Sequence, residues 1–323
     1  MISLVHKPAW FREGQVFVSY ATTVGINKDG EDLFVVDAET GMRTGVIDDQ
    51  IAGDVAALVD EFDTTETSRW VELDGLTDQL TAVPNYFDER PVREFVALMK
   101  SPEMQGFTSA SIGDLIEDES LISMNGHGSP SADFRTGHVP YIKVSDIRAG
   151  QVNINPTNRV PDVVAERFWK GSGSGLEAYD LITPIRTSKN IGEFAVIMPG
   201  QERVVLTKEV LVLRAAESAP FDNFYLLWAM TLKAVRRQWD RVVFMQTNRE
   251  DVGRRYREIL IPVPPNREVA DRASKAFRDY YLGTQRLRED LLSYLANDDK
   301  HYIFMSSAAA VEEADDEPEG DIA

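Results

Sequence analysis

Short blocks rich in β-branched and apolar residues, set in a fixed order between Val139 and Pro264, constrain the fold of this chain most strongly. In order they read VPYIKVSDIRAGQV, IRTSKNIGEFAVI, VVLTKEVLVLR, QTNRED and ILIPVPP. Runs of this composition are typical of β-strands. Each block by itself occurs in many proteins, so the signal lies in their order and spacing. Together they predict a β-rich domain in the middle of the chain.

A long helix is expected after these blocks, with Asn266 as its N-cap. Apolar or small side chains then recur in a 4-3 alternation, the spacing of a coiled-coil seam, at Ala273, Phe277, Tyr280, Thr284, Leu287, Leu291 and Tyr294. At ~1.5 Å per residue this helix extends roughly 45 Å. One helix cannot bury such a stripe alone. We therefore expect partial packing on its own domain and pairing with a partner helix through Phe277, Tyr280, Leu287 and Leu291.

Charge is unevenly distributed along the chain, whose formal net charge is −19. Residues 1–134 hold 8 Lys and Arg against 25 Asp and Glu, residues 135–260 hold 19 against 14, and residues 261–323 hold 7 against 14. Phosphates repel an acidic protein and attract a basic one. The middle segment is thus the part expected to meet nucleic acid.

These features divide an α+β chain into parts. Residues 1–105 form an acidic α+β region, with strands expected at 15–20 and 33–37 and helices starting near Asp48 and Pro91. The first of these helices carries one apolar face, made of Ile51, Val55, Leu58, Val59 and Phe62. Residues 106–265 form the β-rich domain, residues 266–297 the coiled-coil spacer helix, and residues 306–323 an acidic tail that we expect to be disordered.

A further helix is expected at residues 221–238, inside the β-rich domain. It carries an aromatic stripe at helical spacing, formed by Phe221, Phe224, Tyr225 and Trp228. Such a stripe beside a sheet is more often core than a platform for stacking bases. We therefore assign it to the core.

The ordered blocks, with the opening sequence Ser111-Ile112-Gly113-Asp114-Leu115-Ile116, resemble the target-recognition domain of type I restriction-modification specificity subunits. The resemblance covers residue 111 to about residue 294. It implies a non-catalytic subunit that binds double-stranded DNA by sequence and positions a separate DNA methyltransferase there, in a restriction or phage-defence system. It also implies that S-adenosylmethionine belongs to the partner methyltransferase, so that this chain itself has no cofactor.

The resemblance also bears on assembly. In that family two recognition domains are separated by two antiparallel helices, whereas this chain has one domain and one helix. This implies either self-association of two copies through the C-terminal helix or pairing with a helix of the methyltransferase. A restriction or translocase subunit as a further partner is left open.

The N-terminal stretch 14–30, GQVFVSYATTVGINKDG, resembles the region after the catalytic domain of N6-adenine DNA methyltransferases. This implies a methyltransferase-associated N-terminal region. Catalysis itself would need a glycine-rich strand-to-helix turn for the cofactor and an Asn/Asp-Pro-Pro-aromatic loop for a flipped adenine. The sequence holds neither motif, which argues against a catalytic methyltransferase.

Side chains suited to DNA gather in two polar loops of the basic segment. Arg, Asn and Gln can read base edges, whereas Lys, Ser and Thr fix the register on phosphates. The first loop holds Arg186, Ser188, Lys189 and Asn190, and the second holds Gln246, Thr247, Asn248 and Arg249. By resemblance both loops lie on the DNA-facing side, where they are joined by Lys143 and Ser145.

The densest basic cluster adds four more candidates for DNA contact: Arg236, Arg237, Arg254 and Arg255. A charge run taken alone is more often a solvated helix face. Its position inside the recognition-domain pattern favours DNA contact instead.

Other kinds of function are less well supported. The chain has no cysteine, which excludes disulfides and cysteine-based zinc sites, and its four histidines lack metal-ligand spacing. His127 lies in an Asn-Gly-His-Gly segment that is expected to be a mobile loop. No signal peptide or membrane-spanning run is found, so we expect a cytoplasmic protein without membrane contact. The alternative function is a protein–protein adaptor whose acidic N-terminal region is the working part and which makes no DNA contact.

Overall fold

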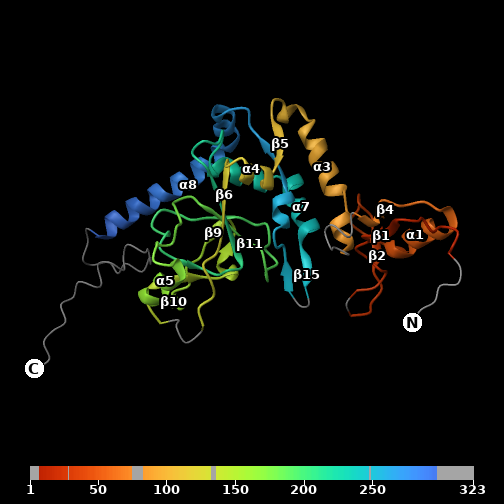
Figure 1. The fold of residues 1–323 in the computed structure, drawn as a ribbon, viewed down its shortest axis with the longest axis horizontal. Coiled ribbons are helices and arrows are strands. Elements are labelled where there is room, and N and C mark those ends of the chain that lie inside the picture. Colours follow the sequence, from red (N-terminus) through yellow and green to blue (C-terminus); the bar gives the residue numbers. More distant parts are fainter. Residues whose placement is uncertain (1–6, 28, 75–82, 132–135, 247–248, 297–323) are drawn as a thin grey trace, which may run out of the picture. The chain divides into compact units, whose positions relative to one another are not determined.

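The computed structural model describes residues 7–27, 29–74, 83–131, 136–246 and 249–296. The chain forms two compact units, Met1–Arg90 (unit 1) and Pro91–Ala323 (unit 2). Both units combine helices and strands (Figure 1), which confirms the expected α+β class. The units divide nearer the N-terminus than residue 105, and the tail at 306–323 lies outside the described residues. Within the described part, no helix is long and apolar enough to cross a membrane.

Unit 1 contains two small antiparallel sheets and a short helix. β1 pairs with β4, and β2 pairs with β3. The elements are β1 (Gln15–Ser19), β2 (Phe34–Val36), β3 (Arg43–Ile47), α1 (Gln50–Ala56), the π-helical turn η1 (Ala57–Glu61), β4 (Ser68–Glu72) and the 3-10 turn η2 (Pro84–Phe87). The buried cluster is small and consists of Val18, Tyr20 and Val71, with Phe87 packed against it.

A six-stranded sheet occupies the centre of unit 2, in the order β6-β14-β11-β12-β9-β8. Its strands are β6 (Leu121–Asn125), β8 (Ile147–Arg148), β9 (Gln151–Val152), β11 (Leu181–Pro184), β12 (Ala195–Val196) and β14 (Val210–Ala215). In β14, Leu211 and Leu213 face one apolar cluster, whereas Val210 and Val212 face another. Because both faces of the strand are covered, its sequence is continuously apolar rather than alternating.

A smaller sheet of order β10-β7-β13 adjoins the second cluster. It consists of β7 (Val139–Ile142), β10 (Arg159–Val160) and β13 (Val205–Leu206), and α5 (Asp162–Trp169) packs on it. The Trp169 indole N–H donates to the Val204 carbonyl at 3.1 Å. Trp169 is therefore a core residue.

The segment that precedes the sheets and the segment that follows them pair with each other. β5 (Thr108–Ser111) and β17 (Leu260–Val263) run antiparallel, with Ser111 opposite Leu260 and Thr108 opposite Val263. Ser111 also caps α4 (Ile112–Glu117) in a capping box with Asp114. α3 (Arg90–Met99) begins beside Pro91 and buries Phe95, as the sequence predicts.

The single helix expected at residues 221–238 is in fact two helices, α6 (Asn223–Thr231) and α7 (Lys233–Val242). Leu232 has a ψ of 129°, which ends the first helix. The core assignment of the aromatic stripe is confirmed, because Phe221, Phe224 and Tyr225 are buried and Trp228 packs against the same cluster.

The long helix α8 (Arg267–Ala296, blue in Figure 1) packs on unit 2 only along its first half. Ala270, Ser274 and Tyr281 are buried, and Phe277 packs against the main cluster. Farther along the predicted seam, Tyr280, Leu287, Leu291 and Tyr294 are 45–73% exposed. The helix therefore carries two adjacent stripes. One is buried against the rest of unit 2, and the other stays largely exposed.

His127 is not in a mobile loop, contrary to the expectation from its Asn-Gly-His-Gly segment. Its Nδ1 accepts the Leu206 N–H at 2.9 Å, and its Nε2 lies 2.8 Å from the Ser174 carbonyl oxygen. Since Nδ1 is the acceptor, the proton of the neutral ring is on Nε2. Burial holds the pKa of His127 below its ordinary value of 6.5, and the bond to Ser174 offsets this only in part.

Acidification is expected to destabilise unit 2 through His127. The folded state favours the neutral ring, so this contribution to stability is fully present above pH ~6.5 and is lost as the pH falls towards the lowered pKa of the folded state. Urea unfolding at pH 7.5 and 5.5 checks this. His127→Asn should be less stable at pH 7.5 and should lose less stability on acidification. An equal loss in both proteins would contradict the assignment.

Candidate nucleic-acid interface

The structure brings the first predicted polar loop to the strand that follows the second loop. The first loop, residues 186–190, follows β11, and the second joins β15 (Phe244–Gln246) to β16 (Arg249–Asp251). Arg186 forms a β-bridge with Asp251, and its guanidinium lies 2.8 Å from the Asp251 carboxylate. The Thr187 N–H donates to the Glu250 carbonyl at 2.9 Å. Segments some sixty residues apart in sequence thus form one surface of unit 2.

Thr187 has a φ of 57°, in the left-handed region. This conformation is unfavourable for a β-branched residue and costs on the order of 1–3 kcal/mol. The contacts of Arg186 and Thr187 with β16 hold the backbone there. The loop is therefore fixed in shape, and the side chains that follow, Ser188 to Asn190, project from a rigid base.

A hollow of about 650 Å³ opens beside these loops. Its cationic lining residues are Arg186, Lys208, Arg254 and Arg257, and its polar lining includes Ser123, Asn125 and Tyr256. Asp251 is the acidic residue of the lining. The excess of positive charge and of hydrogen-bond donors makes the hollow suitable for phosphate oxygens and for polar base edges.

The cations of the hollow differ in what they contact. Arg186 pairs with Asp251, and Arg257 pairs with Glu117 at 2.9 Å. Lys208 and Arg254 are exposed, and neither forms an ion pair with another residue in the described part of the chain. They are the two cations of the hollow that are best placed to take a new anionic partner.

Lys208 is a candidate that the sequence did not reveal. It lies in the turn between β13 and β14, flanked by Thr207 and Glu209, and outside the basic cluster. A lone lysine in a turn gives no signal in the sequence. Only the packing of β14 beside β6 and β11 brings this turn to the hollow.

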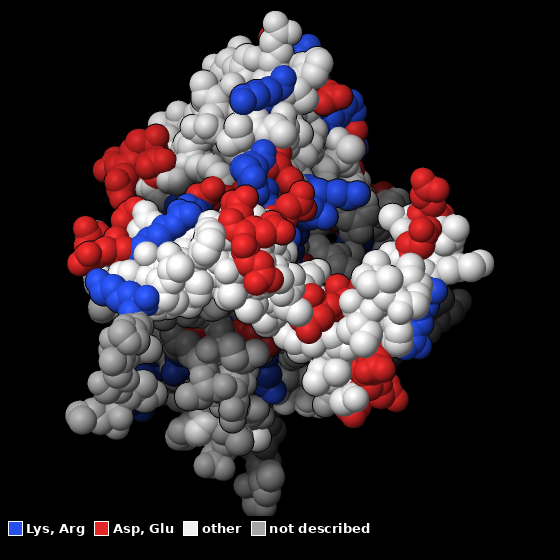
Figure 2. Space-filling view, turned by 90° about the vertical axis from the view of Figure 1, so that its right-hand side faces the viewer, with Lys and Arg blue, Asp and Glu red and all other residues white. Residues whose placement is uncertain are grey.

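Three arginines of the predicted basic cluster are engaged within the protein. Arg236 pairs with Asp240, and Arg237 pairs with Glu94. Arg255 stacks 3.5 Å from the centre of the Phe244 ring and donates to the carbonyls of Val242 and Asp251. Figure 2 shows positive and negative side chains interspersed on the face that it presents. Much of the cluster's charge is therefore balanced locally.

The remaining predicted residues lie near the first loop or outside the described part. Asn190 donates to the Ile147 carbonyl at 3.5 Å, which places the loop beside the 3-10 turn η5 (Val144–Asp146). In that region Lys143 donates to Asn158 at 2.7 Å and Ser145 contacts Asp146 at 3.4 Å. Lys189 is exposed, and Ser188 accepts the Asn190 N–H. Thr247, Asn248 and the side chains of Gln246 and Arg249 lie outside the described residues.

The described side chains form no group of three or more His, Asp or Glu placed to hold a metal ion. The fully buried carboxylate of unit 2, that of Asp180, pairs with Arg214 at 2.6 Å. This pair joins β14 to the turn before β11 and belongs to the scaffold.

No protein-family model matches the chain, and no curated protein matches it. Among solved structures, it is similar to the S subunit of the type I restriction-modification system from M. genitalium, at 14% identity and a TM-score of 0.38, over 58% of this chain and 41% of that chain. The HsdS subunit from Thermoanaerobacter tengcongensis matches at 12% identity and a TM-score of 0.34, over 77% of this chain and 58% of that one.

A third match is a chain from a structure that concerns complex assembly and conformational transition of the type I restriction-modification system. It has 11% identity and a TM-score of 0.37, over 82% of this chain and 66% of that one. This chain thus spans 41–66% of the length of these three proteins. The type IIG restriction endonuclease BpuSI also matches, at 8% identity and a TM-score of 0.41, over 70% of this chain and 33% of that one. The chain is thus similar to proteins of restriction-modification systems, among them type I specificity subunits.

Proposed function

We propose that this chain is the DNA-recognition component of a restriction-modification or related phage-defence complex, and that it directs a separate DNA methyltransferase to its target. One observation carries the proposal: the first polar loop is held by β16 beside a cationic hollow in which Lys208 and Arg254 are exposed and have no ion pair with described residues. Unpaired cations beside fixed polar side chains are what binding to a DNA backbone and reading of its bases require.

The residues have separate roles in this proposal. Lys208 and Arg254 contact phosphates and set the position of the duplex. Arg186 and Asn190 on the first loop, with Asn248 on the second, face the base edges. The chain needs no cofactor of its own, because S-adenosylmethionine is bound by the methyltransferase subunit. A restriction or translocase subunit completes the complex where DNA is also cleaved.

Lys208→Ala combined with Arg254→Ala is expected to weaken binding to every DNA sequence. The logarithm of the association constant falls linearly with the logarithm of the salt concentration, and each lost phosphate contact makes this slope about 0.9 less steep. The slope of the double variant should therefore be less steep by roughly 1.8. Fluorescence anisotropy with a labelled duplex between 50 and 200 mM salt measures this. Arg272→Ala, which removes an exposed arginine of α8 outside the hollow, is the matched control and should keep the wild-type slope.

Base readers should behave differently from phosphate contacts. Asn190→Ala is expected to change which duplex is preferred in a selection from a random library, with a smaller change in the salt slope. If Asn190→Ala weakened binding to all duplexes equally, as the Lys208 and Arg254 variant is expected to do, this division of roles would be contradicted.

A second candidate function is a protein–protein adaptor that makes no DNA contact. The net charge of −19 favours it, because DNA repels an acidic protein. The same titration separates the two functions. Absence of DNA binding at 50 mM salt, also with the methyltransferase present, would favour the adaptor, whereas a salt-dependent affinity favours DNA recognition.

A further inference from the structure

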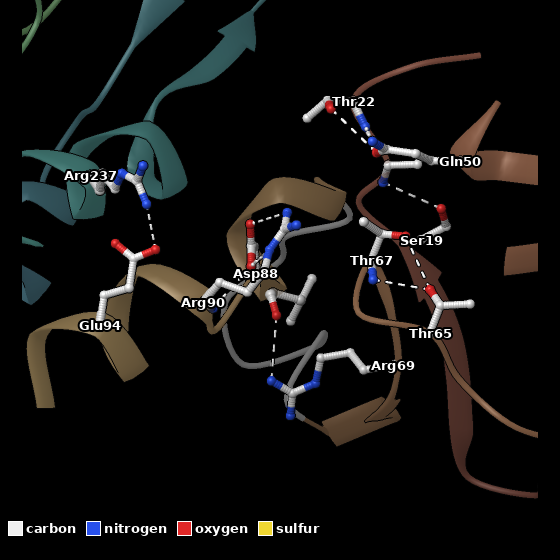
Figure 3. A network of polar contacts seen from close by, with 12 residues as sticks. Ser19, Thr22, Gln50, Thr65, Thr67, Arg69, Asp88, Arg90, Glu94 and Arg237 are labelled. Carbon is white, nitrogen blue, oxygen red and sulfur yellow. Dashed lines mark hydrogen bonds and ion pairs between the residues drawn. The ribbon is translucent and has the colours of Figure 1, made fainter. Parts of the chain in front are cut away.

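The helical segment α1–η1 of unit 1 turns its polar side inward. Gln50, Asp54 and Leu58 lie on successive turns and face the unit, and Asp54 and Leu58 are buried. The Gln50 side chain accepts from the Thr22 N–H at 3.1 Å (Figure 3). The Asp54 carboxylate accepts from the hydroxyls of Ser19, Thr65 and Thr67. A buried carboxylate is tolerated only with such donors, so these bonds fix which side of the helix faces in.

The apolar side of the same segment faces outward. Ile51, Val55, Val59 and Phe62, here called the outer stripe, are 40–51% exposed. A surface helix normally buries its apolar stripe against the core. Here the polar anchors occupy that position, and the outer stripe extends roughly 16 Å along the helix without a covering group in the described part of the chain.

Carboxylates border the end of the outer stripe. Asp60, Glu61 and Asp63 follow Val59 and are exposed, and none of the three forms an ion pair with a described residue. Unit 1 as a whole holds 6 Lys and Arg against 18 Asp and Glu. The stripe is therefore an apolar strip with an acidic border.

The described cations of unit 1 are engaged elsewhere. Lys7, Arg69 and Arg90 pair with Glu13, Glu89 and Asp88. Arg12 stacks on Trp70, and Arg43 stacks on Phe34. None of these five cations matches the acidic border, which leaves its carboxylates open to the cations of another molecule. A second copy of unit 1 would bring a further acidic border and be repelled.

We propose that the outer stripe docks a helix of a partner protein, and that the apolar face of this helix is flanked by Lys or Arg. Three of its four residues, Ile51, Val55 and Val59, lie on successive helical turns, which suits the packing of one helix on another. The acidic border selects for basic flanks and against acidic ones. This partner site is separate from the hollow and does not depend on DNA binding.

Two synthetic 21-residue amphipathic helices test the proposal on the full-length chain. They share the same leucine stripe and differ only in carrying Lys or Glu at the flanking positions. Fluorescence anisotropy should show the Lys peptide binding at least tenfold more tightly than the Glu peptide. This preference should shrink as salt is raised from 50 to 500 mM.

Paired variants separate docking on the stripe from general attraction to an acidic protein. Val55→Gln with Val59→Gln removes the centre of the stripe and leaves the net charge unchanged, and it should weaken binding of the Lys peptide at least tenfold. Ala52→Gln with Ala56→Gln places the same residues at exposed positions beside the stripe and should bind as the wild type does. All three proteins should have the same circular dichroism spectrum and thermal midpoint.

Several results would overturn the proposal. One is equal binding of the Lys peptide by the two variants, which would mean non-specific charge attraction. Another is a self-association of the wild type that the Val55 and Val59 variant loses in light scattering, which would make a second copy the occupant. A third is binding of the chain to phosphatidylcholine vesicles that the same variant loses. DNA binding, measured on the same proteins, should be equal in all of them, so failure here leaves the proposed function intact.

Discussion

A chain carrying Leu287→Asp and Leu291→Asp is expected to lose all association through α8 while unit 2 stays folded. These side chains are 73% and 45% exposed, so the substitution disturbs little inside the chain. In a helix pair each would be buried, with a contribution on the order of 1.5–3 kcal/mol, and a buried aspartate would cost more than the lost leucine. Multi-angle light scattering, with and without the methyltransferase subunit, measures the result.

The control for this experiment keeps the charge change and moves it to another face of α8. Arg286→Gln with Ser293→Asp alters the net charge by the same amount, at positions away from the exposed stripe. It should associate as the wild type does. A wild-type chain that remains monomeric at micromolar concentration, alone and with the methyltransferase, would show that the exposed half of α8 is not an association surface.

Asp54→Ala is expected to destabilise unit 1 by roughly 2–4 kcal/mol, because it leaves three hydroxyl donors without their acceptor inside the unit. For a unit whose buried cluster is only Val18, Tyr20 and Val71, this is a large fraction of its stability. Hydrogen exchange of the β1 and β4 amides reports on unit 1 separately from unit 2. Protection should fall in unit 1 and stay unchanged in β14.

Asp60→Ala is the matched control for the Asp54 variant. Asp60 is an exposed carboxylate in the same helical segment and has no ion pair with a described residue. Its removal should change stability by no more than about 0.5 kcal/mol. Equal exchange in the two variants would mean that Asp54 does not anchor the helix.

The sequence predicts best where burial is complete. The run VLVLR became β14, the block VPYI became β7, and the aromatic stripe of α6 became core, because a segment covered on all sides must be apolar throughout. The break at Leu232 was missed, since the residues on both sides favour helix and only the packing of α7 requires the turn.

Long-range contacts cannot be read from a local pattern. Asp54 meets hydroxyls from β1 and from the segment before β4, and this leaves Ile51, Val55, Val59 and Phe62 of the predicted apolar face exposed. In the candidate interface, Arg237 and Arg257 meet Glu94 and Glu117, more than a hundred residues away. No local pattern shows which cations of a cluster are balanced in this way.

The pairing of β5 with β17 has a consequence for how such a chain can diversify. The segment between Ser111 and Leu260 contains the six-stranded sheet and both loops. Its two ends lie on β5 and β17, which pair with each other. A segment whose ends lie together can be exchanged for another of different sequence without displacing what flanks it. Recombination within the two strands would therefore replace the candidate interface as a single unit and leave α8 attached at the same place.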